Sequence, residues 1–358
     1  MGLQVKEKSS LLLVQKLLNS RINCQKKIIT TLRFVVGFSL ALYLIYATLK
    51  FTGVSFWRVI NQASIPLLLL ALFFQGVIAC ITSYRLSLLL RVQGVHLQIY
   101  KVLRLTLIGV FFSLTLPGSV SGDLVKMSFV TQYTKDKKME AILTVMLDRA
   151  LGLFGLFIVA SFVVFFSLPF LLNLEKNYRP VQIAAFLVGL GSIGGMILIG
   201  LVELRQTLLR FPWFAWIVNH SAQKMPTSIV SNLTRLVKAL ELYRQNRRTI
   251  LVAIALSILV HLCLAINLFC VGASIGDDTL GLRDYFLASL VANAVAAIPL
   301  TPGGIGTRDA MVAMFFSAMQ APMDKIGIVP VIMTLIFVFW GLVGGAIFVF
   351  SKELKIAL

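Results

Sequence analysis

Six charged residues stand inside or directly beside apolar stretches of this sequence, in three pairs. They are Asp123 and Lys126, Asp148 and Arg149, and Arg308 and Asp309. An arginine presents a planar fork of donors that matches phosphate oxygens, and a lysine attracts the same group as a compact point charge. A nearby carboxylate can orient the cation or accept a hydrogen bond from an ammonium group. These residue types therefore suit recognition of a molecule that carries a phosphate.

Two of the pairs follow a Pro-Gly break in an apolar run, in FFSLTLPGSVSGDLVK at 111–126 and AAIPLTPGGIGTRDAM at 296–311. Proline stops a helix, and glycine permits a tight backbone path. Backbone amides at the start of a following helix can hold an anion, and we expect helices to begin near Asp123 and Asp309. The candidate binding residues are Pro117, Gly118, Gly122, Asp123, Lys126, Asp148, Arg149, Pro302, Gly303, Gly304, Arg308 and Asp309.

Each pair also has a structural interpretation, which stays open at this point. Asp123 can cap a helix, with Lys126 as an ordinary loop lysine. Asp148 and Arg149 are adjacent and point about 100° apart on a helix, so we expect each to face a separate partner. They can instead lie near the membrane surface, with Arg149 extended toward water. Arg308 and Asp309 can form a local ion pair.

The composition is that of a polytopic membrane protein. Of 358 residues, 58% are hydrophobic and 13% are charged, whereas about a quarter are charged in soluble domains. The net charge of +19 comes from Lys and Arg gathered between apolar runs, which is typical of membrane proteins rather than of nucleic-acid-binding ones. The three histidines and four cysteines suggest no metal site, and we expect no cofactor.

Six apolar runs are long enough to span a membrane. They cover about 32–49, 66–84, 141–168, 181–202, 250–272 and 327–350. With Arg33 at the edge of the first run counted before it, the numbers of Lys and Arg before, between and after these runs are seven, two, eight, two, eight, three and two. By the positive-inside rule, both termini are predicted to be cytoplasmic in an inner membrane.

The two broken segments, 103–122 and 285–320, are too short on each side of the break for a comfortable crossing. We expect them to be re-entrant hairpins that enter from opposite faces and line a central polar cavity, because irregular backbone at membrane depth needs protein or water around it. The predicted fold class is therefore an all-α membrane protein with about six spans and two re-entrant hairpins in an inverted-repeat-like arrangement.

The predicted organisation is a basic cytoplasmic segment at 1–30, one transmembrane domain at 31–350 and a short cytoplasmic tail at 351–358. Within the domain, the loop at about 203–249 has an apolar face and many basic residues, which suits a helix lying on anionic lipid headgroups. A helix docked on the bundle is the alternative.

LPGSVSGDLVK, LDRALGLFGLF at 147–157 and TPGGIGTRDA occur in this order. They resemble the flippase-like transmembrane family named for the lysylphosphatidylglycerol synthase transmembrane region, over roughly residues 30–350. In Thr307-Arg308-Asp309 the acid is shifted by one position from the family's usual pattern.

The resemblance implies a bacterial or archaeal lipid-handling protein that binds or flips a phospholipid or lipid-linked glycan. The soluble aminoacyl-transfer domain of multidomain members is absent from these residues, so we expect no enzyme activity. Two alternatives remain: a membrane-embedded transferase with Asp123 or Asp148 as base, and a structural subunit of a glycolipid or polysaccharide assembly complex. The expected partners are membrane lipids, with self-association or pathway enzymes as open alternatives.

Overall fold

The computed structural model describes residues 61, 63–116, 120–134, 137–208, 241–243, 245–298 and 301–351. These residues form helices joined by turns, without a strand among them. The expected first span at 32–49, the candidate residues Pro117 and Gly118, and most of the expected amphipathic loop lie outside the described residues.

Four long helices form the frame of the described bundle. They are α3 (Ile65–Val92), α6 (Lys138–Phe166), α11 (Arg247–Ser274) and α14 (Met323–Phe350). At 1.5 Å per residue, each is about 42 Å long, which exceeds the ~30 Å hydrocarbon core of a bilayer. All four contain an apolar window that is long enough to span a membrane. The prediction of an all-α, multi-pass membrane protein is therefore confirmed.

Other helices complete the frame. The 30-residue helix α8 (Arg179–Leu208) covers the expected span at 181–202. Between α6 and α8 lie the short helix α7 (Leu168–Leu172) and the 3-10 turn η1 (Lys176–Tyr178). Most expected spans coincide with a helix. Helix α3, however, continues to Val92, whereas the corresponding span was expected to end at about residue 84. Arg85, counted above as a loop residue, is thus inside a helix.

Both broken segments are pairs of short helices. The first pair is α4 (Ile99–Thr115) and α5 (Ser121–Gln132). The second pair is α12 (Leu282–Ala296) and α13 (Thr307–Ala318), with the 3-10 turn η2 (Pro302–Gly304) between them. These helices are about 18–26 Å long, which is less than the ~30 Å hydrocarbon core.

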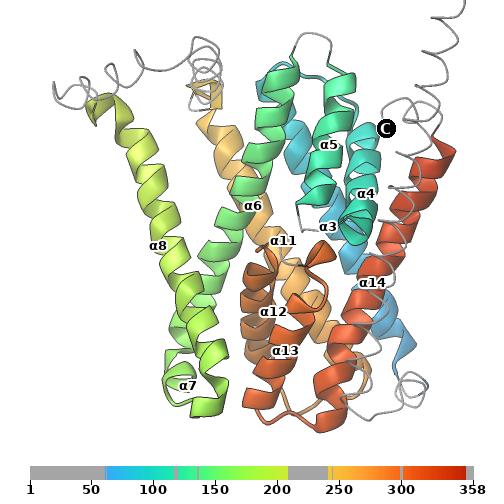
Figure 1. Cartoon of the computed structure of the whole chain (residues 1–358), viewed down its shortest axis with the longest axis vertical. Helices are drawn as coiled ribbons and strands as arrows, with labels where there is room; N and C mark the ends of the chain where they lie inside the picture. Colours follow the sequence, from blue (N-terminus) through green and yellow to red (C-terminus); the bar gives the residue numbers. More distant parts are fainter. Residues whose placement is uncertain are drawn as a thin grey trace, which may run out of the picture.

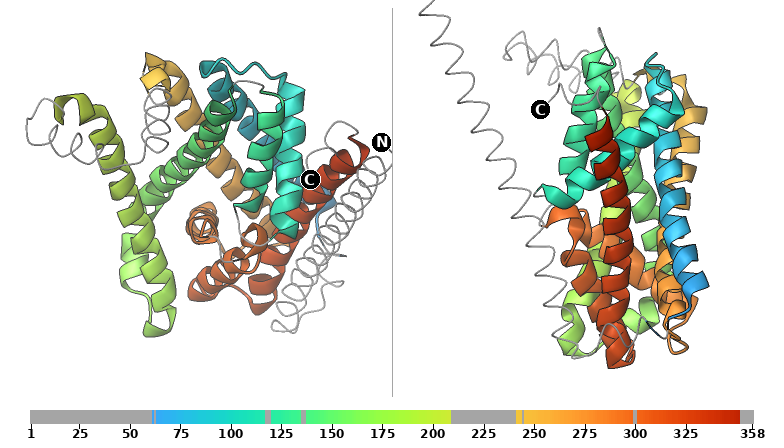
Figure 2. Two further views of the ribbon diagram at one scale, coloured as in Figure 1. Left: turned by 45° about the horizontal axis from the view of Figure 1, so that its top comes forward. Right: turned by 90° about the vertical axis from the view of Figure 1, so that its right-hand side faces the viewer.

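The two hairpins enter the bundle from opposite ends (Figure 1). In the views of Figures 1 and 2, α4 and α5 occupy one half of the bundle, and α12 and α13 occupy the other. The order of long helix, hairpin and long helix occurs twice, first as α3 to α6 and then as α11 to α14, and the second set runs in the opposite direction. This arrangement is the one that an inverted repeat would give. The entry of the hairpins into a membrane stays a prediction.

Helix α12 lies at the centre of the largest apolar core. Tyr285, Leu287, Leu290 and Val291 are at most 1% exposed. Large apolar side chains on the outer helices, by contrast, face outward, as Phe73, Phe162 and Leu190 do. In water such a surface would be costly, so these side chains are suited to contact with acyl chains.

Three glycines make the second break possible. Gly303, Gly304 and Gly306 have φ angles of 58°, 73° and 87°, in a left-handed region that other residues rarely adopt. Helix α13 then begins with its own cap, because the Asp309 carboxylate accepts a hydrogen bond from the Gly306 N–H at 3.1 Å. The segment from Pro302 to Gly306 therefore carries the chain through the tight turn from which α13 starts.

The end of the bundle at which α3 ends and α6 and α11 begin carries Arg91, Lys137, Lys138, Arg247 and Arg248. We call this end the basic end, and the positive-inside rule predicts that it is cytoplasmic.

Cysteine labelling can test this topology. In a variant without the four native cysteines, Gln98→Cys at the basic end and Asp278→Cys at the opposite end should react with a membrane-impermeant maleimide from opposite sides. In intact cells only Asp278→Cys is expected to react, and Gln98→Cys should react after permeabilisation. Labelling of both from one side would contradict the topology.

The loop between α11 and α12 is fastened to α14 through Asp277. This carboxylate accepts hydrogen bonds from the hydroxyl groups of Thr279 and Tyr285, and Lys325 Nζ lies 3.5 Å from it. Burial alone would raise the pKa of Asp277, but these hydrogen bonds and the charge of Lys325 hold the pKa below its usual value. The ionised form therefore stabilises the fold.

A lowered pKa gives stability that is present above the ordinary pKa of about 3.9 and is lost as the pH falls through the lower folded value. Asp277→Asn should therefore lower the free energy of unfolding by about 1–3 kcal/mol at pH 7. The difference in melting temperature from the wild type should shrink as the pH approaches 3. Asp278→Asn is the matched control, because the Asp278 side chain is 92% exposed, and it should change little.

Candidate headgroup-binding site at the two hairpin breaks

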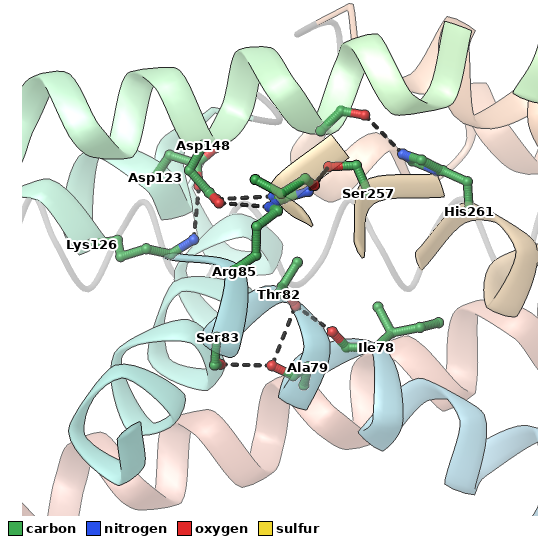
Figure 3. Close-up of polar contacts among 12 residues, drawn as sticks. Ile78, Ala79, Thr82, Ser83, Arg85, Asp123, Lys126, Asp148, Ser257 and His261 are labelled. Atoms are coloured by element: carbon green, nitrogen blue, oxygen red, sulfur yellow. Dashed lines mark hydrogen bonds and ion pairs between the residues drawn. The ribbon is translucent and has the colours of Figure 1, made fainter. Parts of the chain in front are cut away.

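The first cluster of charges joins three helices through Arg85 of α3. Its Nε and Nη2 donate to the two carboxylate oxygens of Asp148 on α6, at 2.7 and 3.0 Å, and its Nη1 donates to the Ser257 hydroxyl of α11 at 2.7 Å. Figure 3 shows this guanidinium between Asp148 and Ser257. We call these three residues the Arg85 cluster.

The Arg85 cluster is buried and satisfied. Arg85 and Asp148 are 4% and 5% exposed, and both carboxylate oxygens accept a hydrogen bond from the guanidinium. Gly152, one turn after Asp148 on α6, lies beside the guanidinium, because a Cβ atom there would be in van der Waals contact with Nη1 and Nη2 of Arg85 at 3.4 Å. His261 Nε2 also lies 3.0 Å from the Gly152 carbonyl oxygen. The cluster thus ties α3, α6 and α11 together at depth.

The second cluster is centred on Asp123, just after the first break. Its carboxylate oxygens lie 3.1 Å from Lys126 Nζ and 2.9 Å from Arg149 Nη1. The side chains of Asp123 and Lys126 are 14% and 12% exposed, and that of Arg149 is 35% exposed. Two cations share one carboxylate, so this Asp123 cluster carries an excess positive charge.

Glycine places Asp123 in the interior. A Cβ atom on Gly122 would lie 2.1 Å from both the Gly109 carbonyl oxygen and Ser113 Oγ. The backbones of α4 and α5 therefore touch here, which only glycine allows. The interpretation of Asp123 as a helix cap is wrong, because α5 begins at Ser121 and Asp123 is its third residue, paired with cations and not with a backbone amide.

The third cluster follows the second break. Arg308 donates from Nε and Nη2 to Asp309 Oδ1 at 3.1 and 3.0 Å, and Nη2 also donates to the Thr334 hydroxyl at 2.5 Å. Thr334, on α14, in turn donates to Asp309 Oδ2 at 2.9 Å. All three residues of this Arg308 cluster are at most 7% exposed. The local ion pair of Arg308 and Asp309 does form, but it is buried.

The second break lies against the end of α4. A Cβ atom on Gly303 of η2 would lie 3.5 Å from the Ser113 carbonyl oxygen at the end of α4, and 3.1 Å from the Phe337 ring of α14. The guanidinium carbon of Arg308 lies 5.9 Å from the centre of the same ring. The second break, the end of α4 and the Arg308 cluster are therefore neighbours.

The structure brings most of the candidate residues into these three clusters or the breaks beside them. Asp148 and Arg149 do face separate partners, as expected from their 100° separation. Two cavities in the described part of the chain, one beside Leu116 and Phe129 and one beside His96 and Lys137, are not lined by the charged residues of the clusters. The charged groups of the Arg85 and Arg308 clusters are buried in their own ion pairs. Metal-ligand groups of three or more His, Cys, Asp or Glu are absent among the described residues.

Sequence reasoning missed Arg85, Ser257 and Thr334. The signal for Arg85 was present, because the apolar residues Leu86 and Leu88–Leu90 continue the helix beyond it. Ser257 and Thr334 each stand alone in an apolar run, where such residues usually bond to the backbone of the same helix.

Removal of one partner from the Arg85 cluster should be costly, because it leaves a buried charge without compensation. We expect Arg85→Met or Asp148→Leu alone to lower the free energy of unfolding by about 3–5 kcal/mol. The double variant should recover most of this loss. Thermal unfolding of the purified protein in detergent measures each change, and additive losses in the double variant would show that the pair is not coupled.

With this geometry established, comparisons with known proteins can be added. The sequence model of the protein family described as “Lysylphosphatidylglycerol synthase TM region” matches residues 31–346. The match covers the whole described bundle from α3 to most of α14. No curated protein matches the chain.

Proposed function

Because the chain belongs to the lysylphosphatidylglycerol synthase transmembrane-region family, which is linked to lipid handling, we propose that it binds the headgroup of a phospholipid or lipid-linked glycan and moves it across the membrane. The observation that carries this proposal is the contact of the second break with the end of α4, with charged clusters on the helices that follow the two breaks. Irregular backbone and paired charges at membrane depth mark substrate sites in transporters.

The proposed binding step is an exchange of partners. Arg308 holds Asp309 with Nε and Nη2, and the same fork of donors fits two oxygens of a phosphate. A headgroup phosphate that takes the place of the Asp309 carboxylate would keep the guanidinium paired throughout. Exchange therefore avoids the cost of about 3–5 kcal/mol that an unpaired buried charge would impose.

The Asp123 cluster supports a second position for the same headgroup. Lys126 and Arg149 share the single Asp123 carboxylate, so an incoming phosphate would balance the second positive charge. The Asp123 and Arg308 clusters lie on different hairpins, which enter from opposite ends of the bundle. A headgroup that passes from one cluster to the other would thus move from one half of the membrane toward the other.

A flipping assay with a fluorescent phospholipid in liposomes tests this function. Arg308→Ala should reduce the rate of translocation by tenfold or more, because the phosphate loses a bidentate partner. Arg308→Lys keeps the charge but not the fork, and should retain an intermediate rate. Arg179→Ala removes an exposed arginine at the start of α8 and should leave the rate unchanged.

The melting temperature of each variant separates a lost site from a lost fold. Equal translocation by the wild type and a folded Arg308→Ala variant would remove Arg308 from the mechanism and favour a structural role in an assembly complex. Transfer of a headgroup without translocation would instead favour the membrane-embedded transferase.

A further inference from the structure

A cavity lies at the basic end of the bundle, apart from the three clusters. It has a volume of about 230 Å³ and lies between the turn that joins α3 to α4 and the turn that joins α5 to α6. We call it the turn cavity. Its lining residues are Gly94, Val95, His96, Leu97, Tyr133, Thr134 and Lys137.

One lysine lines the turn cavity, and a second lies over the ring of a lining tyrosine. Lys137 Nζ donates hydrogen bonds to the carbonyl oxygens of Gln93 and Gly94 at 3.1 and 3.3 Å. An ammonium group has three donors, so these two contacts fix its position and leave one donor for a ligand. His96 is exposed in the lining, and Lys101 Nζ lies 5.4 Å from the centre of the Tyr133 ring. Among the described residues that line the cavity, none is acidic.

Backbone donors add to this positive character. The N–H groups of His96 and Leu97 have no acceptor among the described residues. Helix α4 begins at Ile99, two residues after Leu97, so the positive end of its dipole lies beside the cavity. Two backbone N–H groups without an acceptor in the described part of the chain, and one lysine, thus belong to residues that line the cavity.

The size and place of the cavity restrict the anion. Pockets for whole drug-sized ligands usually occupy about 300–1,000 Å³, whereas one water takes about 30 Å³. The turn cavity therefore suits a single phosphate group better than a nucleotide. It lies just past the end of α3, which is about 42 Å long and exceeds the ~30 Å hydrocarbon core, so the cavity is expected at the depth of lipid headgroups.

We propose that the turn cavity binds the phosphate group of an anionic membrane lipid, as a second lipid site separate from the clusters at the hairpin breaks. The bound phosphate would link the two turns at the base of the α4–α5 hairpin. In the described structure these turns are already joined by the hydrogen bonds of Lys137 to Gln93 and Gly94. This inference goes beyond the proposed translocation and does not depend on it, since it requires only that the protein lies in a membrane.

Lipid binding by the full-length protein in detergent tests the proposal, with fluorescent phosphatidylglycerol as the anionic probe and fluorescent phosphatidylcholine as the comparison, whose zwitterionic headgroup has no net charge. Lys137→Ala and Lys138→Ala remove the same charge one residue apart, but only Lys137 lines the cavity. Lys137→Ala should weaken phosphatidylglycerol binding about tenfold more than Lys138→Ala, because a charge-assisted hydrogen bond is lost. Equal losses would show unspecific attraction and overturn the proposal.

His96→Glu is the second variant. It leaves Lys137 and its hydrogen bonds to Gln93 and Gly94 in place and adds a carboxylate to the cavity lining. It should also weaken phosphatidylglycerol binding about tenfold, while phosphatidylcholine binding stays the same. An unchanged affinity in this variant would contradict the site.

The same measurements in an Arg308→Ala background distinguish the two lipid sites. The effects of Lys137→Ala and His96→Glu should persist there, whatever Arg308→Ala does to translocation. The last measurement uses inorganic phosphate as a competitor of the lipid. If millimolar phosphate displaces the lipid from the wild type, or stabilises the wild type but not His96→Glu, the ligand is a soluble anion and the lipid assignment is wrong.

Discussion

Each charge inside the described bundle has a partner on the protein, and this constraint organises the structure. An ionised group at membrane depth costs several kcal/mol unless it is paired or wet. Arg85, Asp148, Arg308 and Asp309 are all at most 7% exposed. The Arg85 cluster joins α3, α6 and α11, and the Arg308 cluster joins α13 to α14. The charges therefore determine which helices lie together, and the apolar residues fill the space around them.

The same constraint explains why the hairpins break where they do. Helix ends leave backbone groups unpaired, and water is scarce at membrane depth. In α13 the Asp309 carboxylate bonds to the Gly306 amide, to Thr334 and to Arg308. One side chain thus caps the helix and balances a charge. The glycines of the break bring the end of α4 close enough to cover this region, so the backbone and the charges are protected together.

The sequence predicted the class of protein, most helices and both breaks, because these depend on local patterns of apolar residues, proline and glycine. It also predicted that Asp148 and Arg149 would point to separate partners, since helix geometry alone requires this. The partners themselves were not predictable. Arg85 and Asp148 are 63 positions apart in the chain, and only the packing of α3 on α6 brings them together. The cap alternative for Asp123 fails because α5 begins at Ser121, two residues earlier.

The hydrogen bonds of the three carboxylates Asp123, Asp148 and Asp309 show which ion pair is structural and which ion pairs can exchange a partner. Asp148 directs both oxygens to Arg85, so loss of that arginine would leave it without compensation. Asp309 contacts Arg308 through Oδ1, while its Oδ2 keeps the Gly306 amide and the Thr334 hydroxyl. Asp123 likewise retains one cation when the other leaves. Release of Arg308 or Arg149 to a phosphate therefore leaves each carboxylate with a partner, whereas release of Arg85 does not. On these grounds the Arg85 cluster holds the frame, and the clusters beside the breaks are the ones that can change partners in the proposed translocation.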